Sequence, residues 1–369
     1  MAKHKDLDTK MISGIQQIGV GVTNIYEAWK WYIPHFGMDI RLFEEKATAE
    51  YMLRYTDGEP RERHAALALN LLGGGGFEIW QHTEHTPAAP GFELKAGDLG
   101  IFAGKLKAPD VLAAYDQLSK DANTITGVVK DPAGRDSFYV KDPFNNIWQI
   151  VKEGSHFLKQ HKKCTGGSYG AVIGTTNPEK AIKLYGGVLG YDTIVYDTTG
   201  TCEDLKDLPG GKNKFRRVLL QHSEKRKGPF SNLFGPTEIE LVQVLDRTPE
   251  KIYKNRIWGD LGFIHLCFDV LGMRALKEEC AREGFPFTVD SDIHPQGKPF
   301  DIGAAAGHFA YVEDPDGTLI EFVETHKIPI SKRLGWYINL WDRKDVTKPL
   351  PNLLMQMIRF MKVKPHKLV

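Results

Sequence analysis

The stretch GVTNIYEAWKWYIPHFGMD, residues 21–39, reappears in altered form as GTTNPEKAIKLYGGVLGYD at residues 174–192. The two stretches share Gly, Thr, Asn, Ala, Lys, Tyr, Gly and Asp at a constant offset of 153 residues. In the second stretch, Asn177 is suited to cap a helix and Pro178 to occupy its first turn. Similarity at a fixed spacing within one chain indicates a fold built by internal duplication.

Two further copies of this unit are visible elsewhere in the chain. The motif GDLG occurs at residues 97–100 and again at 259–262. Later in the same copies, SFYVKDPFNNIWQIV (137–151) resembles HFAYVEDPDGTLIEFV (308–323), and both contain Asp-Pro. The chain therefore divides into four units of roughly 75 to 90 residues, joined by connecting stretches near 86–96, 153–166 and 246–258.

Each unit has the pattern of one strand, one helix and three further strands. In the first strand Ile18, Val20 and Val22 alternate with a second set of residues, Gln17, Gly19 and Gly21. Because successive side chains of a strand point to opposite faces, the apolar set is expected to meet the helix. The second set is then expected to line the concave side of a curved sheet.

Two positions on this concave side recur in all four units. The first lies seven residues before each predicted helix start, and it holds Gln17, Ala103, Gly170 and His265. The second lies 46 to 70 residues later on the closing strand, and it holds Glu78, Gln149, Glu240 and Glu321. Histidine, glutamate and glutamine at matching positions of some copies, with small residues in others, indicate a metal site built by duplication.

Composition limits the class of protein. With 369 residues, 41% hydrophobic and 26% charged, the chain has the composition of a globular protein of about two domains. A net charge of +1 gives no indication of nucleic-acid binding. No stretch has the length and apolarity of a membrane span or a secretory signal, and the four cysteines are too scattered for a disulfide framework. We therefore expect a cytoplasmic protein.

The strand–helix–three-strand unit, the seven-residue spacing and the closing Asp-Pro-Asp-Gly-x-x-x-Glu resemble the vicinal oxygen chelate superfamily of glyoxalases, bleomycin-resistance proteins and dioxygenases. The resemblance covers about residues 12–327. It implies an α+β fold of four βαβββ modules paired into two open-barrel domains. In chain order these domains would be residues 12–153 and 166–327, followed by a C-terminal tail, 328–369, that contains a helix.

The resemblance also implies a site for one divalent metal ion. Carried over by position, the candidate ligands are Gln17, Glu78, Glu240, His265 and Glu321. If the first module pairs with the fourth, the set is Gln17, Glu78, His265 and Glu321, as in glyoxalase I. If pairing follows chain order, Glu240 joins His265 and Glu321 instead. We favour the first pairing, because it gives one complete site and one vestige.

Imidazole, carboxylate and amide ligands without thiolates suit Zn²⁺, Ni²⁺, Co²⁺, Mn²⁺ or Fe²⁺. The resemblance implies an isomerase, epimerase or lyase that removes a proton next to a carbonyl and forms a metal-bound enediolate. Its small-molecule substrate would be a hydroxy-ketone, a keto-sugar or a hemithioacetal. Glu321 or Glu78 would serve as the catalytic base, because a partly desolvated glutamate is suited to this role.

Two alternatives remain open from the sequence. One is an Fe(II)-dependent dioxygenase acting on a ring or a keto acid. The dioxygenase branch has a second histidine at the position of Gly170, which counts against this alternative. The other is a non-catalytic protein that binds a small molecule. We expect His308 to contact substrate. His294 has no assigned role, and a place in a loop over the pocket is the minority interpretation of its glycine- and proline-rich segment. The apolar face of 353–362 is expected to pack against a barrel or against a second copy in a homodimer.

Overall fold

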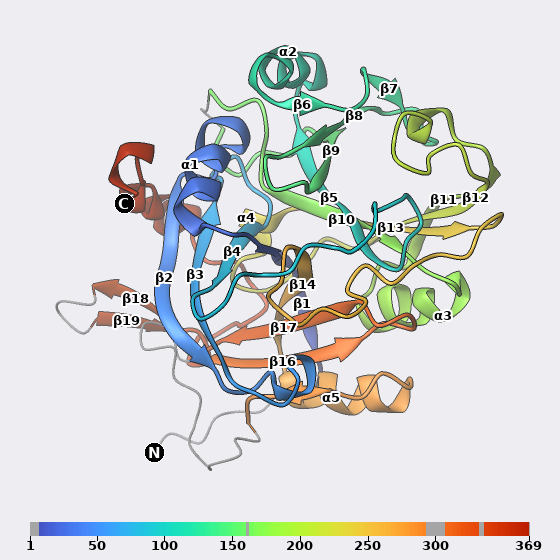
Figure 1. Cartoon of the computed structure of the whole chain (residues 1–369). Helices are drawn as coiled ribbons and strands as arrows, with labels where there is room; N and C mark the ends of the chain where they lie inside the picture. Colours follow the sequence, from blue (N-terminus) through green and yellow to red (C-terminus); the bar gives the residue numbers. More distant parts are fainter. Residues whose placement is uncertain (1–6, 160–161, 293–306, 332–335, 369) are drawn as a thin grey trace.

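Two strongly curled sheets form the molecule, and each is assembled from two of the four units (Figure 1). The structure is a computed structural model that describes residues 7–159, 162–292, 307–331 and 336–368. Strands predominate and helices are few, so the predicted α+β class is confirmed.

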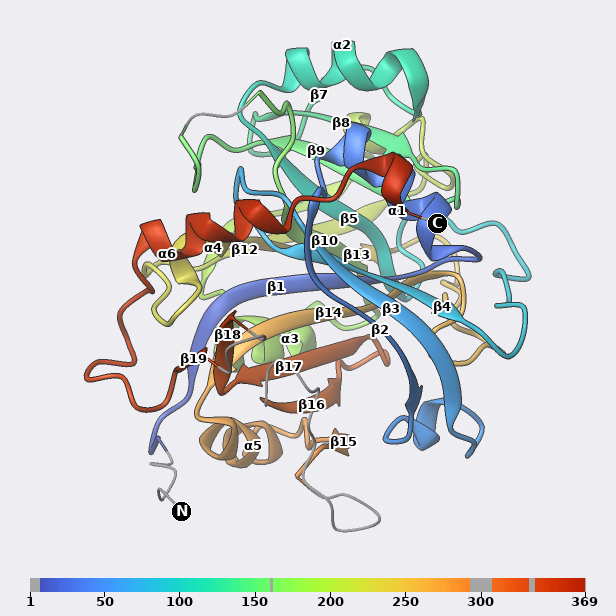
Figure 2. The ribbon, with the colours of Figure 1, turned by 90° about the vertical axis from the view of Figure 1, so that its left-hand side faces the viewer.

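The eight-stranded sheet combines the first unit with the fourth. Its strands from the first unit are β1 (Met11–Gly21), β2 (Ile40–Ala49), β3 (Arg61–Leu69) and β4 (Gly76–His82). Those from the fourth unit are β14 (Gly262–Leu271), β15 (Val289–Asp290), β16 (Gly307–Glu313) and β17 (Leu319–Thr325). The strand order is β15-β16-β17-β14-β1-β4-β3-β2, and the antiparallel pair β1–β14 joins the two units at the centre. Figure 2 shows these two strands side by side.

The nine-stranded sheet combines the second unit with the third. The second unit contributes β5 (Gly100–Ala108), β6 (Asn123–Thr124), β7 (Val129–Lys130), β8 (Asp136–Lys141) and β9 (Ile147–Lys152). The third contributes β10 (Ser168–Gly174), β11 (Thr193–Gly200), β12 (Phe215–Gln221) and β13 (Glu238–Val244). The order is β11-β12-β13-β10-β5-β9-β8-β6, with β7 paired to β8. Here β10 and β5 are the central pair.

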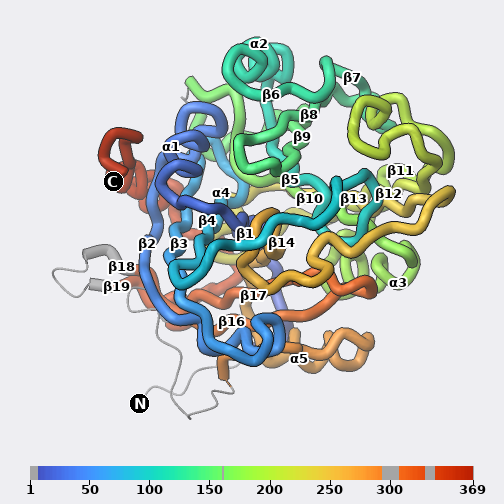
Figure 3. The backbone as a smooth tube through the Cα atoms, viewed as in Figure 1, coloured from blue at the N-terminus to red at the C-terminus, as the bar shows by residue number. Residues whose placement is uncertain are grey.

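The favoured pairing of first with fourth and second with third is therefore the one in the structure. Figure 3 traces this path, in which the orange and red end of the chain returns beside the blue beginning. Neither residues 12–153 nor residues 166–327 contain a complete sheet. The division into two domains at these residues remains a prediction. Strand pairing joins the first unit to the fourth and the second to the third, not units that are adjacent in the sequence.

One helix follows the first strand of each unit. These helices are α1 (Ile25–Phe36), α2 (Val111–Asp121), α3 (Pro178–Ile182, continued to Val188 as a π-helix) and α5 (Met273–Arg282). The side chains of Asn24, Asp110 and Asn177 cap the first three by accepting backbone N–H bonds. Gly272, at the start of α5, has no side chain to do so, and its own N–H donates to Glu324 at 2.6 Å.

A pair of buried hydrogen bonds ties the two sheets together and repeats with the duplication. Tyr32 on α1 donates to Asp142 at 2.7 Å, and the equivalent Tyr185 donates to Asp314 at 3.0 Å. Each bond runs from a helix attached to one sheet to an Asp-Pro turn of the other sheet. Burial raises the pKa of Asp314 to about 6, so its ionised form depends on these donors.

The C-terminal tail folds back onto the first unit. It contains the hairpin β18 (Lys327–Ser331) and β19 (Trp336–Asn339), then α6 (Asn352–Gln356) and 3₁₀ turns at Met357–Met361 and Pro365–Lys367. Val363 donates its N–H to the carbonyl of Asp39 at 2.7 Å. The tail thus packs against the barrel, whereas the homodimer remains a prediction. No helix in the described part of the chain is long and apolar enough to cross a membrane.

Removal of either buried tyrosine hydroxyl should destabilise the fold. Tyr32→Phe and Tyr185→Phe each remove one hydrogen-bond donor from a buried carboxylate, so each should lower the free energy of unfolding by about 1.5–3 kcal/mol. The matched control is Tyr115→Phe, a half-buried helical tyrosine, with an expected change within about 0.5 kcal/mol. Urea unfolding measures all three. Equal stability of the three variants would refute a role for these bonds in joining the sheets.

Candidate metal centre

Four side chains from four strands meet on the concave side of the eight-stranded sheet. Gln17 lies on β1, Glu78 on β4, His265 on β14 and Glu321 on β17. The register explains their approach, because Gly19 pairs with both His265 and Glu78 across its two neighbouring strands. Residues that lie opposite one another in a sheet point to the same face. The pairing of β1 with β14 therefore brings both halves of the group together.

The polar atoms of this group lie close to one another. His265 Nε2 is 3.2 Å from Glu78 Oε2 and 3.1 Å from Glu321 Oε2. Gln17 Nε2 is 3.1 Å from Glu78 Oε2 and 3.4 Å from Glu321 Oε2. A metal about 2.0–2.2 Å from its nitrogen and oxygen ligands holds neighbouring ligand atoms roughly 3.0–3.4 Å apart. The observed separations fit this requirement.

Gly19 provides the space that the imidazole needs. A Cβ added at Gly19 would lie 2.6 Å from Cε1 of His265, well inside van der Waals contact. The ring of His265 is fully buried and lies directly over this glycine. Any side chain at position 19 would therefore displace the ring from the carboxylates.

The electrostatics of the group indicate a need for positive charge. Burial disfavours a charged imidazole, yet the carboxylates of Glu321 and Glu78 outweigh burial and raise the pKa of His265 to about 10. Burial would likewise raise the pKa of Glu321, but His265 and Tyr311 bring it below its ordinary value. Among the described residues, His265 is the ion-pair partner of both glutamates, and neither pairs with a lysine or arginine.

The residues present fit a divalent metal ion. They supply an imidazole nitrogen and two carboxylates, which together suit a first-row divalent ion. Gln17 Oε1 is buried without a hydrogen-bond partner. Since the two ends of an amide have nearly the same shape, a rotated Gln17 would direct this oxygen to the position now held by Nε2. An ion there would satisfy all four side chains.

Aromatic side chains form the wall around the group, and the sequence analysis did not identify them. The hydroxyl of Tyr311 donates to Glu321 Oε1 at 2.8 Å. The ring of Trp258 lies nearly parallel to that of His265, at 15° and 6.4 Å between centroids. Trp80 packs against Trp258 edge to face. Alternation along β4 from Glu78 could have identified Trp80, and alternation along β16 could have identified Tyr311.

Glu240 does not join this group, and its assignment as a metal ligand is wrong. It lies in the nine-stranded sheet, where Arg217 Nη2 approaches it at 2.6 Å and Lys105 Nζ at 2.7 Å. Burial alone would raise the pKa of Glu240, but Arg217 and Lys105 hold it far below its ordinary value. This carboxylate already has its cations within the protein.

The register shows why the described residues of the nine-stranded sheet form no equivalent group. Lys105 pairs with Gln149 as Gly19 pairs with Glu78, so a lysine occupies the position that is glycine in the first unit. Its ammonium also contacts Glu238 at 2.7 Å. At Gly170, an added Cβ would lie 1.9 Å from the carbonyl oxygen of Glu238, which leaves no room for a ligand side chain.

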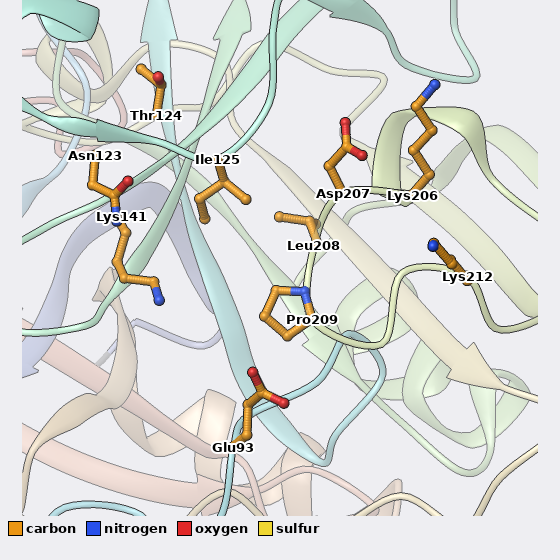
Figure 4. Close-up of a pocket in the computed structure, with 10 residues that line it drawn as sticks. All are labelled: Glu93, Asn123, Thr124, Ile125, Lys141, Lys206, Asp207, Leu208, Pro209 and Lys212. Carbon is orange, nitrogen blue, oxygen red and sulfur yellow. The ribbon is translucent and has the colours of Figure 1, made fainter.

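A surface hollow of about 640 Å³ opens beside this second sheet (Figure 4). Its ten lining residues are Glu93, Asn123, Thr124, Ile125, Lys141, Lys206, Asp207, Leu208, Pro209 and Lys212. They include no histidine or cysteine and none of the four clustered side chains. The hollow is therefore separate from the candidate metal centre.

His308 lies on the other face of its strand from Tyr311 and does not join the candidate metal centre, so its contact with substrate remains a prediction. Tyr311 pairs with Glu321 and faces the metal centre, whereas His308 pairs with Glu324 three residues earlier. Its Nε2 lies 2.7 Å from Asp290 Oδ1, and Asp290 also binds Lys277 of α5. His308 thus belongs to an ion-paired contact on the helix side. His294 lies outside the described residues.

Comparison with known proteins agrees with this geometry. A model of the Glyoxalase/Bleomycin resistance protein/Dioxygenase superfamily matches residues 14–150. Residues 14–150 are thus recognised as part of this superfamily. Glyoxalase I from Zea mays is a structural relative of this chain, with 13% identity, a TM-score of 0.52, and 86% and 92% of the two chains covered. No curated protein matches in sequence.

A second structural relative carries a different description. It is a dioxygenase candidate from Bacillus subtilis, with 13% identity, a TM-score of 0.54, and 86% of each chain covered. At this identity both likenesses concern the fold alone. The reaction has to be argued from the residues of this chain.

Removal of the lysine cation from the nine-stranded sheet should be costly. Lys105→Met leaves Glu238 and Glu240 short of a cation in a buried site, so the free energy of unfolding should fall by about 3–5 kcal/mol. The control is Lys130→Met, whose exposed pair with Asp136 should contribute less than about 1 kcal/mol. Denaturant unfolding measures both variants. Similar losses of unfolding free energy in the two variants would show that the buried ion pairs contribute no more to stability than the exposed pair.

Proposed function

We propose that this chain is a divalent-metal-dependent isomerase, epimerase or lyase that abstracts a proton next to a carbonyl of a small molecule. The observation that carries this proposal is the grouping of Gln17, Glu78, His265 and Glu321 within 3.1–3.4 Å, without a lysine or arginine partner for the carboxylates in the described chain. A protein that only encloses a small molecule has no need of two neighbouring carboxylates that share a single buried imidazole, an arrangement that is costly to maintain.

Gln17, Glu78, His265 and Glu321 would hold the ion, which would be Zn²⁺, Ni²⁺, Co²⁺, Mn²⁺ or Fe²⁺. When bound, such an ion supplies the Lewis acidity that stabilises negative charge on the oxygens of a hydroxy-ketone, a keto-sugar or a hemithioacetal. Tyr311 orients Glu321 through its hydroxyl, and the ring of Trp258 covers His265. Both contacts hold the ligand side chains in place and exclude water from one side.

Glu78 is better suited than Glu321 to act as the base. Glu321 is held at both oxygens, by Tyr311 at Oε1 and by the group at Oε2. Glu78 contacts Gln17 and His265 through Oε2, and its side chain is 14% exposed against 10% for Glu321. A carboxylate with fewer restraints and greater exposure can reach a substrate proton and return it.

The side chains around the site favour a substrate that has both an apolar surface and oxygens that accept hydrogen bonds. The indole nitrogens of Trp80 and Trp258 are buried without a hydrogen-bond partner in the described chain. A buried donor without an acceptor costs about 1–3 kcal/mol, which a substrate oxygen would recover. The rings of Phe309 and Tyr51 lie edge to face nearby and extend the aromatic surface.

The dioxygenase alternative receives less support from the ligand set. Non-haem Fe²⁺ oxygenases use two histidines and one carboxylate. Here one histidine stands with two carboxylates and an amide. The set therefore favours proton transfer over oxygen activation.

Loss of the imidazole should remove one metal ion per chain. His265→Ala deletes a central ligand, so the purified variant should contain one equivalent less of first-row metal than the wild type. Elemental analysis of dialysed protein measures this. The control is Glu240→Gln, which changes the equivalent glutamate of the other sheet and should keep the wild-type content. Equal metal in the wild type and His265→Ala would end the proposal.

Proton abstraction should be visible as solvent exchange. In deuterated water the wild type should exchange the α-protons of dihydroxyacetone, followed by loss of their NMR signal. Glu78→Gln should slow exchange by roughly 10²–10⁴-fold, because a positioned base contributes this much. Its metal content should stay at or near that of the wild type. If Glu78→Gln exchanges at the wild-type rate while Glu321→Gln with bound metal does not, Glu321 is the base.

A further inference from the structure

A second group of metal-ligand side chains lies where two connecting segments meet. His82 ends β4, His85 follows it in the segment between the first two units, and Asp260 lies in the segment before β14. One ligand atom from each of these three residues lies within 4.8 Å of the other two. None of the three belongs to the group formed by Gln17, Glu78, His265 and Glu321.

His82 provides an independent indication of a missing partner. Its side chain is 2% exposed, and neither Nδ1 nor Nε2 has a hydrogen-bond partner in the described chain. The carbonyl of Trp258 approaches the ring without reaching hydrogen-bond geometry. A buried imidazole without a hydrogen-bond partner has a ring nitrogen available for a metal.

The surrounding backbone directs this ring toward Asp260. Gly259 has φ of +93°, which favours glycine, and a Cβ there would lie 2.7 Å from Nε2 of His82. The glycine therefore admits the ring nitrogen next to the carboxylate of Asp260. The ring of His85 lies 4.1 Å from that of His82, at 37°. The two rings are thus close enough for one ion to lie between them.

Asp260 is held in position by its own hydrogen bonds. Its Oδ1 accepts the N–H of Ala88 at 2.8 Å, and its Oδ2 accepts the N–H of Ile257 at 2.9 Å. Each carboxylate oxygen keeps a further lone pair. The carboxylate is thus fixed by both connecting segments and can still bind an ion.

We propose that His82, His85 and Asp260 form a second site, for Zn²⁺ or a similar first-row ion, that joins the two connecting segments. Two imidazoles and one carboxylate are the ligands of many three-residue zinc sites, with a further position open to water or another donor. Calcium and magnesium prefer oxygen ligands and are not suited to this set.

An ion at the second site would restrain the two connecting segments relative to one another. An ion at this position would fix the segment after β4 to the segment that carries Trp258. Trp258 covers His265, so the second ion would hold one wall of the candidate metal centre in place. It would contribute stability and order rather than contact a substrate.

The test counts ions bound to the full-length, metal-free chain by calorimetric titration with Zn²⁺. The wild type should bind two ions, His85→Gln one, His265→Ala one, and the double variant none. His85 is half-buried, so its replacement should leave the fold intact. The matched control is His35→Gln, another half-buried histidine, which should still bind two ions. Zn²⁺ should also raise the melting temperature of His265→Ala but not that of the double variant.

The two proposals fail in different ways. If His85→Gln binds as many ions as the wild type, the second site does not exist, whatever the result at His265. If His265→Ala binds as many ions as the wild type while His85→Gln loses one, the second site stands and the proposed function fails. An ion bound elsewhere on the surface would remain in the double variant and is thereby separated from both.

Discussion

The antiparallel pairing of β1 with β14 is the constraint on which the candidate site depends. It joins the first unit to the last, and it places Gly19 opposite His265 while β4 brings Glu78 to the other side of the same glycine. A shift of one residue in this register would turn His265 to the helix side, since strand side chains alternate. The buried Tyr32–Asp142 and Tyr185–Asp314 bonds hold the two sheets together around this pairing.

The two sheets meet the same physical problem in opposite ways. Each carries buried carboxylates on its concave side, and a buried carboxylate is stable only with a cation or hydrogen-bond donors nearby. The nine-stranded sheet supplies Lys105 and Arg217 from its strands and Arg135 from the turn before β8. Among the described residues, the eight-stranded sheet supplies Glu78 and Glu321 with one imidazole and the hydrogen bonds of Gln17 and Tyr311, but with no lysine or arginine. One sheet thus closes its carboxylates with internal cations, whereas the group in the other sheet suits an external ion.

Much of this arrangement could be predicted from the sequence, because it rests on local rules. The cap residues and the two-residue period of strands located the units and the concave positions, and completeness of the ligand set selected the correct pairing. The fate of Glu240 could not be predicted in this way. Lys105 and Arg217 reach it with long side chains from neighbouring positions, and such reach leaves no periodic signal. The face on which His308 lies could not be predicted either, because it depends on the strand register that Tyr311 and Glu321 define.

The connecting segments carry what the strand pattern does not. Trp258 and Asp260 follow no strand or helix period, yet their segment is held by a bond from the N–H of Trp258 to the carbonyl of Tyr55 at 2.8 Å. Register fixes where the concave positions of paired strands lie. A substitution can therefore change the residue at such a position but not its location. Connecting segments have no such restriction. Where one pattern of ligands serves many reactions, differences in substrate are therefore expected to arise mainly from connecting segments such as 246–258. The aromatic wall beside His265, to which this segment contributes Trp258, is an example.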